Sequence, residues 1–207
     1  MSIVRASAKG DLAQVKKLLA EEADINSADS KGRTALIEAA WGGYFDVVKL
    51  LVEQGADVDC ADMSGFSPLM RAVEEEHVAV VTYLIQKGAD VNTRGNVRGS
   101  TPLMLAAENG SIKLIELLIE HGAKINAVDQ FEETALARAY RMEQIKAVNL
   151  LESKGATRKP DRNHYTYTEK ELRPVTKATV PKWSAEAEDD GFDEEEEPAI
   201  EETFEEE

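Results

Sequence analysis

The chain has 207 residues and a formal net charge of −16, from 40 Asp or Glu against 24 Lys or Arg. Its single cysteine excludes an internal disulfide, and the lack of any run of about 18 apolar residues predicts no transmembrane helix. Direct binding to nucleic-acid phosphates is disfavoured because the chain has no clustered positive face.

One phrase of about thirty-three residues recurs through the first three quarters of the chain. Each copy has a Thr or Ser two positions before a Leu. These residues are Thr34, Ser67, Thr101 and Thr134, and successive ones are 33, 34 and 33 residues apart. A Gly-Ala pair repeats at the same spacing, beginning at Gly55, Gly88, Gly122 and Gly155. A fixed period of this length predicts a stack of small units that bury their apolar surface only against one another.

Each unit is predicted to hold two short helices. The hydroxyl of Thr34 and its equivalents suits a helix N-cap, and Pro68 and Pro102 suit the first helical position, where a missing N–H costs nothing. Gly43 and Gly110 suit a left-handed turn after the first helix, as the Gly of each Gly-Ala pair does after the second. Apolar runs such as those within 47–51 and 112–118 predict the buried side of the second helices.

Two kinds of position depart from this pattern. Glu76 and Glu143 stand where Gly is expected, so their units either end the first helix differently or carry roughly 1 kcal/mol of strain. Arg94, Gly95 and Asn96 make the connection into the fourth unit one residue longer than the others.

The phrase resembles the ankyrin repeat, whose signature is a Thr-Pro-Leu-His-x-Ala turn that opens the first of two helices. Ile37, Met70, Met104 and Ala137 replace the His of that signature. The resemblance implies an all-α solenoid with β-hairpin-like loops over residues 2–158, in repeats at about 2–28, 29–61, 62–95, 96–128 and 129–158. The first unit is expected to begin directly in helix at Ile3. The last unit is expected to turn polar residues to solvent, namely Arg138, Arg141, Lys146, Asn149 and Glu152.

Residues 161–207 are predicted to be a disordered tail, acidic from residue 186 onward. Residues 1–160 carry a net charge of −4 and residues 161–207 carry −12. One interpretation is a solubilising appendage. The other starts from the apolar residues among or beside the acids, which are typical of segments that fold onto a partner: Trp183, Phe192, Ile200 and Phe204. That partner is either a basic protein such as a histone or the tail's own basic stretch before residue 186.

The resemblance also implies that a protein partner binds the hairpin tips and the concave face of the first helices. The candidate binding residues at those positions are Arg33, Trp41, Tyr44, Met63, Phe66, Arg71, Glu74, Arg98, Glu108, Phe131 and Arg141. The same positions also present Lys31, Glu38, Glu75, Val97, Asn109, Glu133 and Arg138. Trp41, Tyr44 and Phe66 are favoured most, because aromatic residues near Arg are typical of interface hot spots. The alternative for Trp41 is that its indole packs onto the next unit.

No residue pattern for catalysis is present, so we expect no enzyme activity, no cofactor and no metal. The histidines at 77, 121 and 164 lie far apart, and Cys60 has no His at useful spacing. Asn92 fits the spacing that an asparaginyl hydroxylase of ankyrin-like repeats prefers, although the fold alone demands the same residues. A monomeric adaptor or scaffold in the cytoplasm or nucleus, not secreted, is the leading hypothesis. The alternative is a regulator that acts through its acidic tail on a basic partner.

Overall fold

The computed structural model describes residues 1–157; residues 158–207, and with them the predicted disordered tail, lie outside the described residues. The described part is all-α, as predicted, and its only β features are isolated bridges in the loops, Ala28 to Thr34 and Gly95 to Ser100. Its helices are α1 (Ile3–Ser7), α2 (Leu12–Ala20), α3 (Ala35–Trp41), α4 (Phe45–Glu53), α5 (Pro68–Glu74), α6 (Val78–Gln86), α7 (Pro102–Asn109), α8 (Ile112–Glu120), α9 (Ala135–Arg141) and α10 (Ile145–Ser153).

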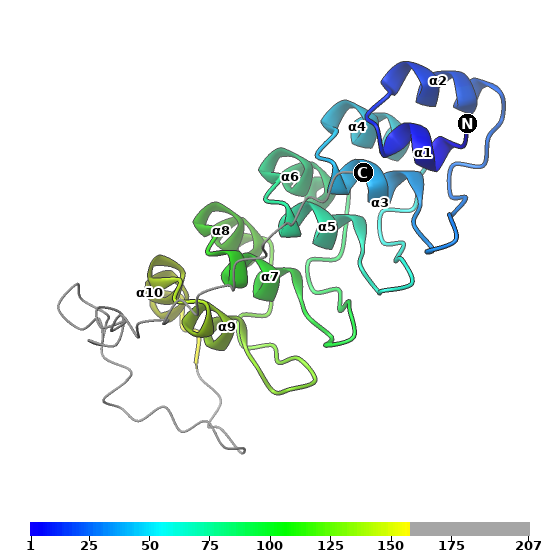
Figure 1. Ribbon diagram of the computed structural model, residues 1–207. Helices are drawn as coiled ribbons and strands as arrows, with labels where there is room; N and C mark the ends of the chain where they lie inside the picture. The colour runs from blue at the N-terminus through cyan, green and yellow to red at the C-terminus, as the bar shows by residue number, and fades with distance from the viewer. Residues whose placement is uncertain (158–207) are drawn as a thin grey trace, which may run out of the picture. The chain divides into compact units, whose positions relative to one another are not determined.

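The helices form five pairs, here called the first to fifth units, and the pairs stack in two layers. Each odd-numbered helix packs against the next odd-numbered helix, and each even-numbered helix packs against the next even-numbered one. Figure 1 shows the two rows side by side, with the long loops that precede α3, α5, α7 and α9 all projecting to the same side. The ends of these loops are called the tips of the second to fifth units below; they are residues 29–33, 62–66, 96–100 and 129–133.

Burial differs between the two layers. The odd-numbered helices are buried almost all round and use small residues such as Ala39, Ala72 and Ala106, which let neighbouring helices approach closely. The even-numbered helices bury one stripe only, for example Val47, Val48 and Leu51 in α4. Helices of five to nine residues are not stable alone, so the stacking supplies their stability. None of the helices in residues 1–157 has the length and apolar character needed to cross a membrane.

The predicted helix starts are confirmed. The hydroxyl oxygens of Thr34, Ser67, Thr101 and Thr134 accept hydrogen bonds from the backbone N–H three residues on, at 3.2–3.4 Å. Each of these residues has an extended backbone, as an N-cap requires. Ser2 caps α1 in the same way, so the first unit does begin in helix at Ile3.

The turn between the two helices of a unit is left-handed in every unit. Gly43 and Gly110 have φ angles of +68° and +73°, and Glu76 and Glu143 have φ angles of +59° and +55°. Of the two outcomes expected for these glutamates, the structure therefore has the second: they make the same turn as glycine, in a conformation that an L-residue adopts at a cost.

A side chain of the following unit explains why three of these positions hold glycine. A Cβ added at Gly10 would collide with the ring of Tyr44, one at Gly43 with His77, and one at Gly110 with Gln144. The small Ser111 stands at the corresponding position after Glu76, and no further unit follows Glu143 within residues 1–157. Glycine thus occurs where the next unit presents a large side chain at the start of its second helix.

In the segment after the second helix of the first four units, one Asn or Asp side chain forms a hydrogen bond to the next unit. The carboxamide oxygen of Asn92 accepts from Lys124 N at 2.8 Å, and its Nδ2 donates to Gly122 O at 3.1 Å. Equivalent oxygens accept backbone N–H groups one unit on: Asn26 from Asp57, Asp59 from Asp90, and Asn126 from Thr157. The fold therefore uses Asn92, and its hydroxylation stays a prediction.

Candidate functional site

Each tip is folded around one acidic or amide side chain. Oδ1 of Asp62 accepts the backbone N–H groups of Ser64 and Phe66, both at 2.9 Å. Asp29, Asn96 and Asp129 do the same in the other tips. The backbone N–H of Arg33 is the largest cause that lowers the pKa of Asp29, so this carboxyl group stays ionised to lower pH than usual. The tips are therefore ordered loops that hold their outer side chains in fixed positions.

Three consecutive tips expose a large apolar side chain. Met63, Val97 and Phe131 are 79%, 86% and 66% exposed. Backbone hydrogen bonds join neighbouring tips, from Met63 N to Lys31 O at 2.9 Å and from Gln130 N to Arg98 O at 2.8 Å. Between the third and fourth tips, where the connection is one residue longer, the described residues contain no such bond. These two tips are nevertheless close to each other: a Cβ added at Gly65 would lie only 3.0 Å from the backbone N of Asn96.

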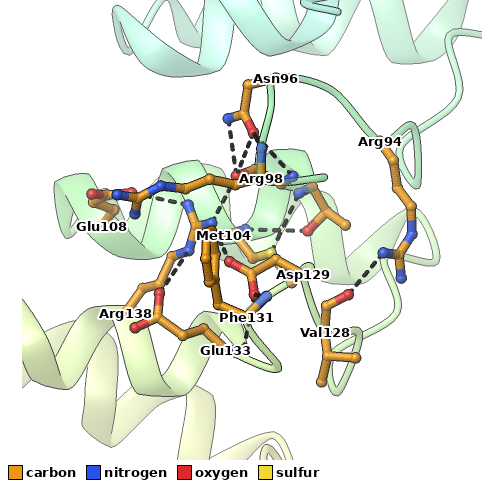
Figure 2. A network of polar contacts seen from close by, with 12 residues as sticks. Arg94, Asn96, Arg98, Met104, Glu108, Val128, Asp129, Phe131, Glu133 and Arg138 are labelled. Carbon is orange, nitrogen blue, oxygen red and sulfur yellow. Dashed lines mark hydrogen bonds and ion pairs between the residues drawn. The ribbon is translucent and has the colours of Figure 1, made fainter.

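Cations flank these apolar side chains. Lys31, Arg94 and Arg98 make no ion pair with any carboxylate in residues 1–157. Arg94 donates to Val128 O at 2.8 Å, and the guanidinium carbon of Arg98 lies 5.6 Å from the ring centroid of Phe131. Figure 2 shows Arg94 and Arg98 on the loop of the fourth unit and Phe131 on the next loop. We call these six side chains the tip surface: Met63, Val97, Phe131, Lys31, Arg94 and Arg98.

Behind the second and third tips, Arg71 joins two aromatic rings. Its guanidinium carbon lies 3.9 Å from the ring centroid of Phe66 and 4.9 Å from that of Trp41. Its Nη2 is 2.6 Å from Asp62 Oδ2 and its Nη1 is 2.9 Å from Glu74 Oε2. Burial alone would lower the pKa of Arg71, but the hydrogen bonds that its guanidinium donates to these two carboxylates outweigh burial and raise the pKa. The cation is thus held rigidly between the rings.

Trp41 links the second unit to the third. The indole is half-buried, and its Nε1 donates to Glu75 Oε1 at 3.0 Å. Arg33 lies 5.9 Å from the ring centroid of Trp41 and is itself paired with Asp29 and Glu38. A hollow of about 430 Å³ opens between Trp41 and Met63, at the second and third tips. Trp41 therefore packs onto the next unit, and one side of the indole remains accessible from the hollow.

The fifth unit holds a second cluster, around Arg138 (Figure 2). The Nη2 of Arg138 is 2.7 Å from Asp129 Oδ2 and 2.7 Å from Ser100 Oγ, and its Nη1 is 3.1 Å from Glu108 Oε2. Arg141 lies at the rim, with its Nη2 3.3 Å from Glu133 Oε2. The expectation that Arg138 faces solvent is wrong: its side chain is 2% exposed, because these neighbours enclose it. Arg138 cannot contact a partner directly.

The structure separates one candidate from the rest. Tyr44 lies after α3, at the end of that helix opposite to the tip, where its ring covers Gly10 and Gly42. The remaining candidates fall into the tip surface and the two clusters behind it. These are Arg33, Trp41, Met63, Phe66, Arg71 and Glu74 in the second and third units, and Arg98, Glu108, Phe131 and Arg141 in the fourth and fifth.

Arg94 was not among the predicted binding residues, because the repeat pattern does not distinguish a residue in the connection before a tip. Only the extra residue at 94–96 marked this connection as different. Glu75 was also missed as the hydrogen-bond partner of Trp41, 34 positions away in the chain. No sequence period joins that pair.

The remaining reactive side chains have structural surroundings. His77 Nε2 lies 3.0 Å from Trp41 O, and Cys60 Sγ lies 3.3 Å from Thr34 Oγ1. Burial raises the pKa of the Cys60 thiol, which favours its neutral form. Within residues 1–157, no group of three His, Cys, Asp or Glu side chains is arranged to hold a metal ion.

Comparison with known proteins gives two findings. The family model described as "Ankyrin repeats (3 copies)" matches residues 3–95 and 93–163. Two ankyrin repeat proteins of Rickettsia felis, RF_p14 and RF_pd14, are each 47% identical over 45 residues. That stretch is 22% of this chain and 71% and 68% of theirs, respectively.

Proposed function

Because the chain belongs to the ankyrin-repeat family, whose repeats generally act as protein–protein interaction modules, we propose that it is a non-catalytic adaptor that binds a protein through the tip surface. The observation that carries the proposal is the row of Met63, Val97 and Phe131 on consecutive tips. Exposed apolar surface that extends over neighbouring loops is typical of interaction sites.

The clusters behind the tips support this surface. Arg71 and Arg138 are held by carboxylates from two or more positions, so the tips need little reordering when a partner binds. A preorganised surface loses less conformational entropy on binding and therefore gives higher affinity for the same contacts. The hollow between Trp41 and Met63 offers a place for one apolar side chain of the partner, where interface hot spots concentrate.

The test compares a tip variant with a matched control. The tip variant carries Met63→Ser, Val97→Ser and Phe131→Ser, and the control carries Met142→Ser, which removes a side chain that is 47% exposed at the opposite end of a first helix. Each protein is crosslinked to its neighbours in cells of the source organism, and captured proteins are quantified by mass spectrometry. We expect the tip variant to lose the proteins captured by wild type and the control to keep them. Equal capture by all three would overturn the proposal.

A further inference from the structure

The tip surface combines exposed apolar side chains with cations, and this combination limits the ligands that it can bind. Met63, Val97 and Phe131 require apolar side chains, whereas the unpaired charges of Lys31, Arg94 and Arg98 require carboxylates between them. The single exposed acid among the tip residues that flank this row is Glu132, at its far end. A segment that carries apolar side chains among acidic ones matches both the apolar and the cationic side chains of the tip surface, and a basic segment does not.

This chain contains such a segment. Residues 186–207 include Phe192, Ile200 and Phe204 among 14 acidic residues, with no Lys or Arg. Residues 158–185, between the last described residue and this segment, have the opposite sign, with 7 Lys or Arg and 3 Asp or Glu. The chemistry that the tips require is therefore found at one end of the chain and not in the stretch that leads to it.

The connection is long enough. Residues 158–185 number 28, and an extended chain of that length reaches roughly 90 Å. The described chain ends at Thr157, in the fifth unit, which also carries Phe131 on its tip. A tether of this kind gives the segment an effective concentration on the order of 1 mM at the tips, which makes even weak contacts count.

We propose that residues 186–207 dock on the tip surface of the same chain and compete there with the protein partner. Phe192, Ile200 and Phe204 cover the exposed apolar tips, and the surrounding acids pair with Lys31, Arg94 and Arg98. The inference rests on the proposed function for its biological role, since it makes the C-terminal segment a regulator of that surface. The docking itself needs no partner and is tested without one.

The experiment places a nitroxide label at position 203 of the full chain, by Thr203→Cys in a Cys60→Ser background. The amide signals of residues 1–185 are then recorded by NMR with the label oxidised and reduced. We expect the oxidised label to remove most of the intensity from amides at Met63, Val97 and Phe131. Amides on the even-numbered helices, such as Lys16 and Lys49, should keep theirs.

Three controls decide the interpretation. The first is a variant of the segment with Phe192→Ser, Ile200→Ser and Phe204→Ser. It keeps every charge of the segment, and the tip amides should regain their intensity. Raising the ionic strength from about 0.05 M to about 0.5 M should weaken the loss of intensity, because the Debye length falls several-fold. Isotope-labelled chains without the nitroxide, mixed with nitroxide chains without isotope, should show no loss at the tips.

Other outcomes overturn the inference. Loss confined to residues 158–185 would show that the segment pairs with its own basic stretch, and loss in the mixed sample would assign the tips to a second copy. Unchanged tip amides would exclude docking altogether. Any of these results leaves the crosslinking test of the adaptor function standing. If docking is found but the tip variant still captures every protein, the adaptor proposal and the competition with a partner fail, whereas the docking itself stands.

Discussion

At the scale of single residues, the left-handed turns show how one unit sets the residue choice in the unit before it. Gly43 faces His77 and Gly110 faces Gln144, whereas Glu76 is followed by the small Ser111. Glycine at the first two positions avoids a collision as well as backbone strain. Glutamate at the third carries the strain only, because its neighbour leaves room for a Cβ.

Replacing Glu76 by Gly should therefore raise the free energy of unfolding. The substitution removes a left-handed L-residue, which costs roughly 1–2 kcal/mol, but glycine also gives the unfolded chain more conformational entropy, which offsets part of this gain. We expect a net gain of up to about 1 kcal/mol, measured by urea denaturation. A loss of stability would show that the Glu76 side chain makes contacts worth more than the strain.

The converse changes should separate strain from collision. A Cβ at Gly43 would lie 2.6 Å from the His77 ring, which is rigid, whereas a Cβ at Gly110 would meet the flexible end of Gln144. Gly43→Ala should therefore destabilise the protein more than Gly110→Ala, and both by more than about 1 kcal/mol. Equal losses in the two variants would mean that backbone strain alone is responsible.

Arg138 gives a third prediction at this scale. Arg138→Leu leaves Asp129, whose side chain is 0% exposed, without its cation, and such losses cost about 3–5 kcal/mol. The fourth unit has uncharged residues at the corresponding positions: Asn96 in place of Asp129 and Leu105 in place of Arg138. Asp129→Asn combined with Arg138→Leu should therefore be more stable than Arg138→Leu alone, in urea denaturation. Additive losses would show that the pair is not coupled.

The residues that sequence alone placed correctly are those whose partners are close in the chain. Thr34 and Gly43 follow from local backbone rules, so their roles were predictable. Arg138 was misplaced because the groups that enclose it include Ser100 and Glu108, 38 and 30 positions away. A polar residue in a last unit is normally turned to solvent, and no sequence pattern indicated that the carboxylates of Asp129, Glu108 and Glu133 (Oε2 3.7 Å from Arg138 Nε) converge on it.

At the scale of elements, the stack is joined by side chains as well as by packing. Asn92 contacts the next unit twice, whereas Asn26 accepts a single hydrogen bond from Asp57. We expect Asn92→Ala to cost about 2 kcal/mol and Asn26→Ala about 1 kcal/mol, since each hydrogen bond contributes about 1 kcal/mol net. Both values come from urea denaturation.

Asn92→Asp is the matched control for this prediction. It keeps the oxygen that accepts from Lys124 and loses the Nδ2 that donates to Gly122, and Asp59 shows that a carboxylate is accepted at the equivalent position. Its loss should lie between wild type and Asn92→Ala. If Asn92→Asp were as damaging as Asn92→Ala, charge at this position would matter more than the number of hydrogen bonds.

The elements themselves were predictable, and their surfaces only partly so. A hydroxyl cap, a glycine turn and an apolar stripe define each helix within about a dozen residues, which explains why the helix pairs were found. The tip surface depends on neighbouring loops lying side by side. That arrangement follows from the repeat, so Met63, Arg98 and Phe131 could be placed on the tips from the sequence, whereas the contact of Trp41 with Glu75 needed the folded chain.

At the scale of the whole molecule, the stack within residues 1–157 has units with two neighbours and units with one. In α2 only Val15 is buried, whereas α6 buries Val80, Val81, Leu84 and Ile85. Each unit is stabilised mainly by its neighbours, so opening should start at the first unit. Hydrogen exchange should therefore be fastest in α2 and slowest in α6. Equal protection in these two helices would mean that residues 1–157 open as one cooperative body.

The glycine turns also restrict the sequence of units along the chain. If the third and fourth units exchanged places, Glu76 would precede the bulky Gln144, and its Cβ would occupy the space that Gln144 fills beside Gly110. Gly43 would precede Ser111, which would leave the groove beside it unfilled. Duplication or shuffling of these repeats during evolution therefore requires paired changes, one in each of two adjacent copies, and the present arrangement is not freely permutable.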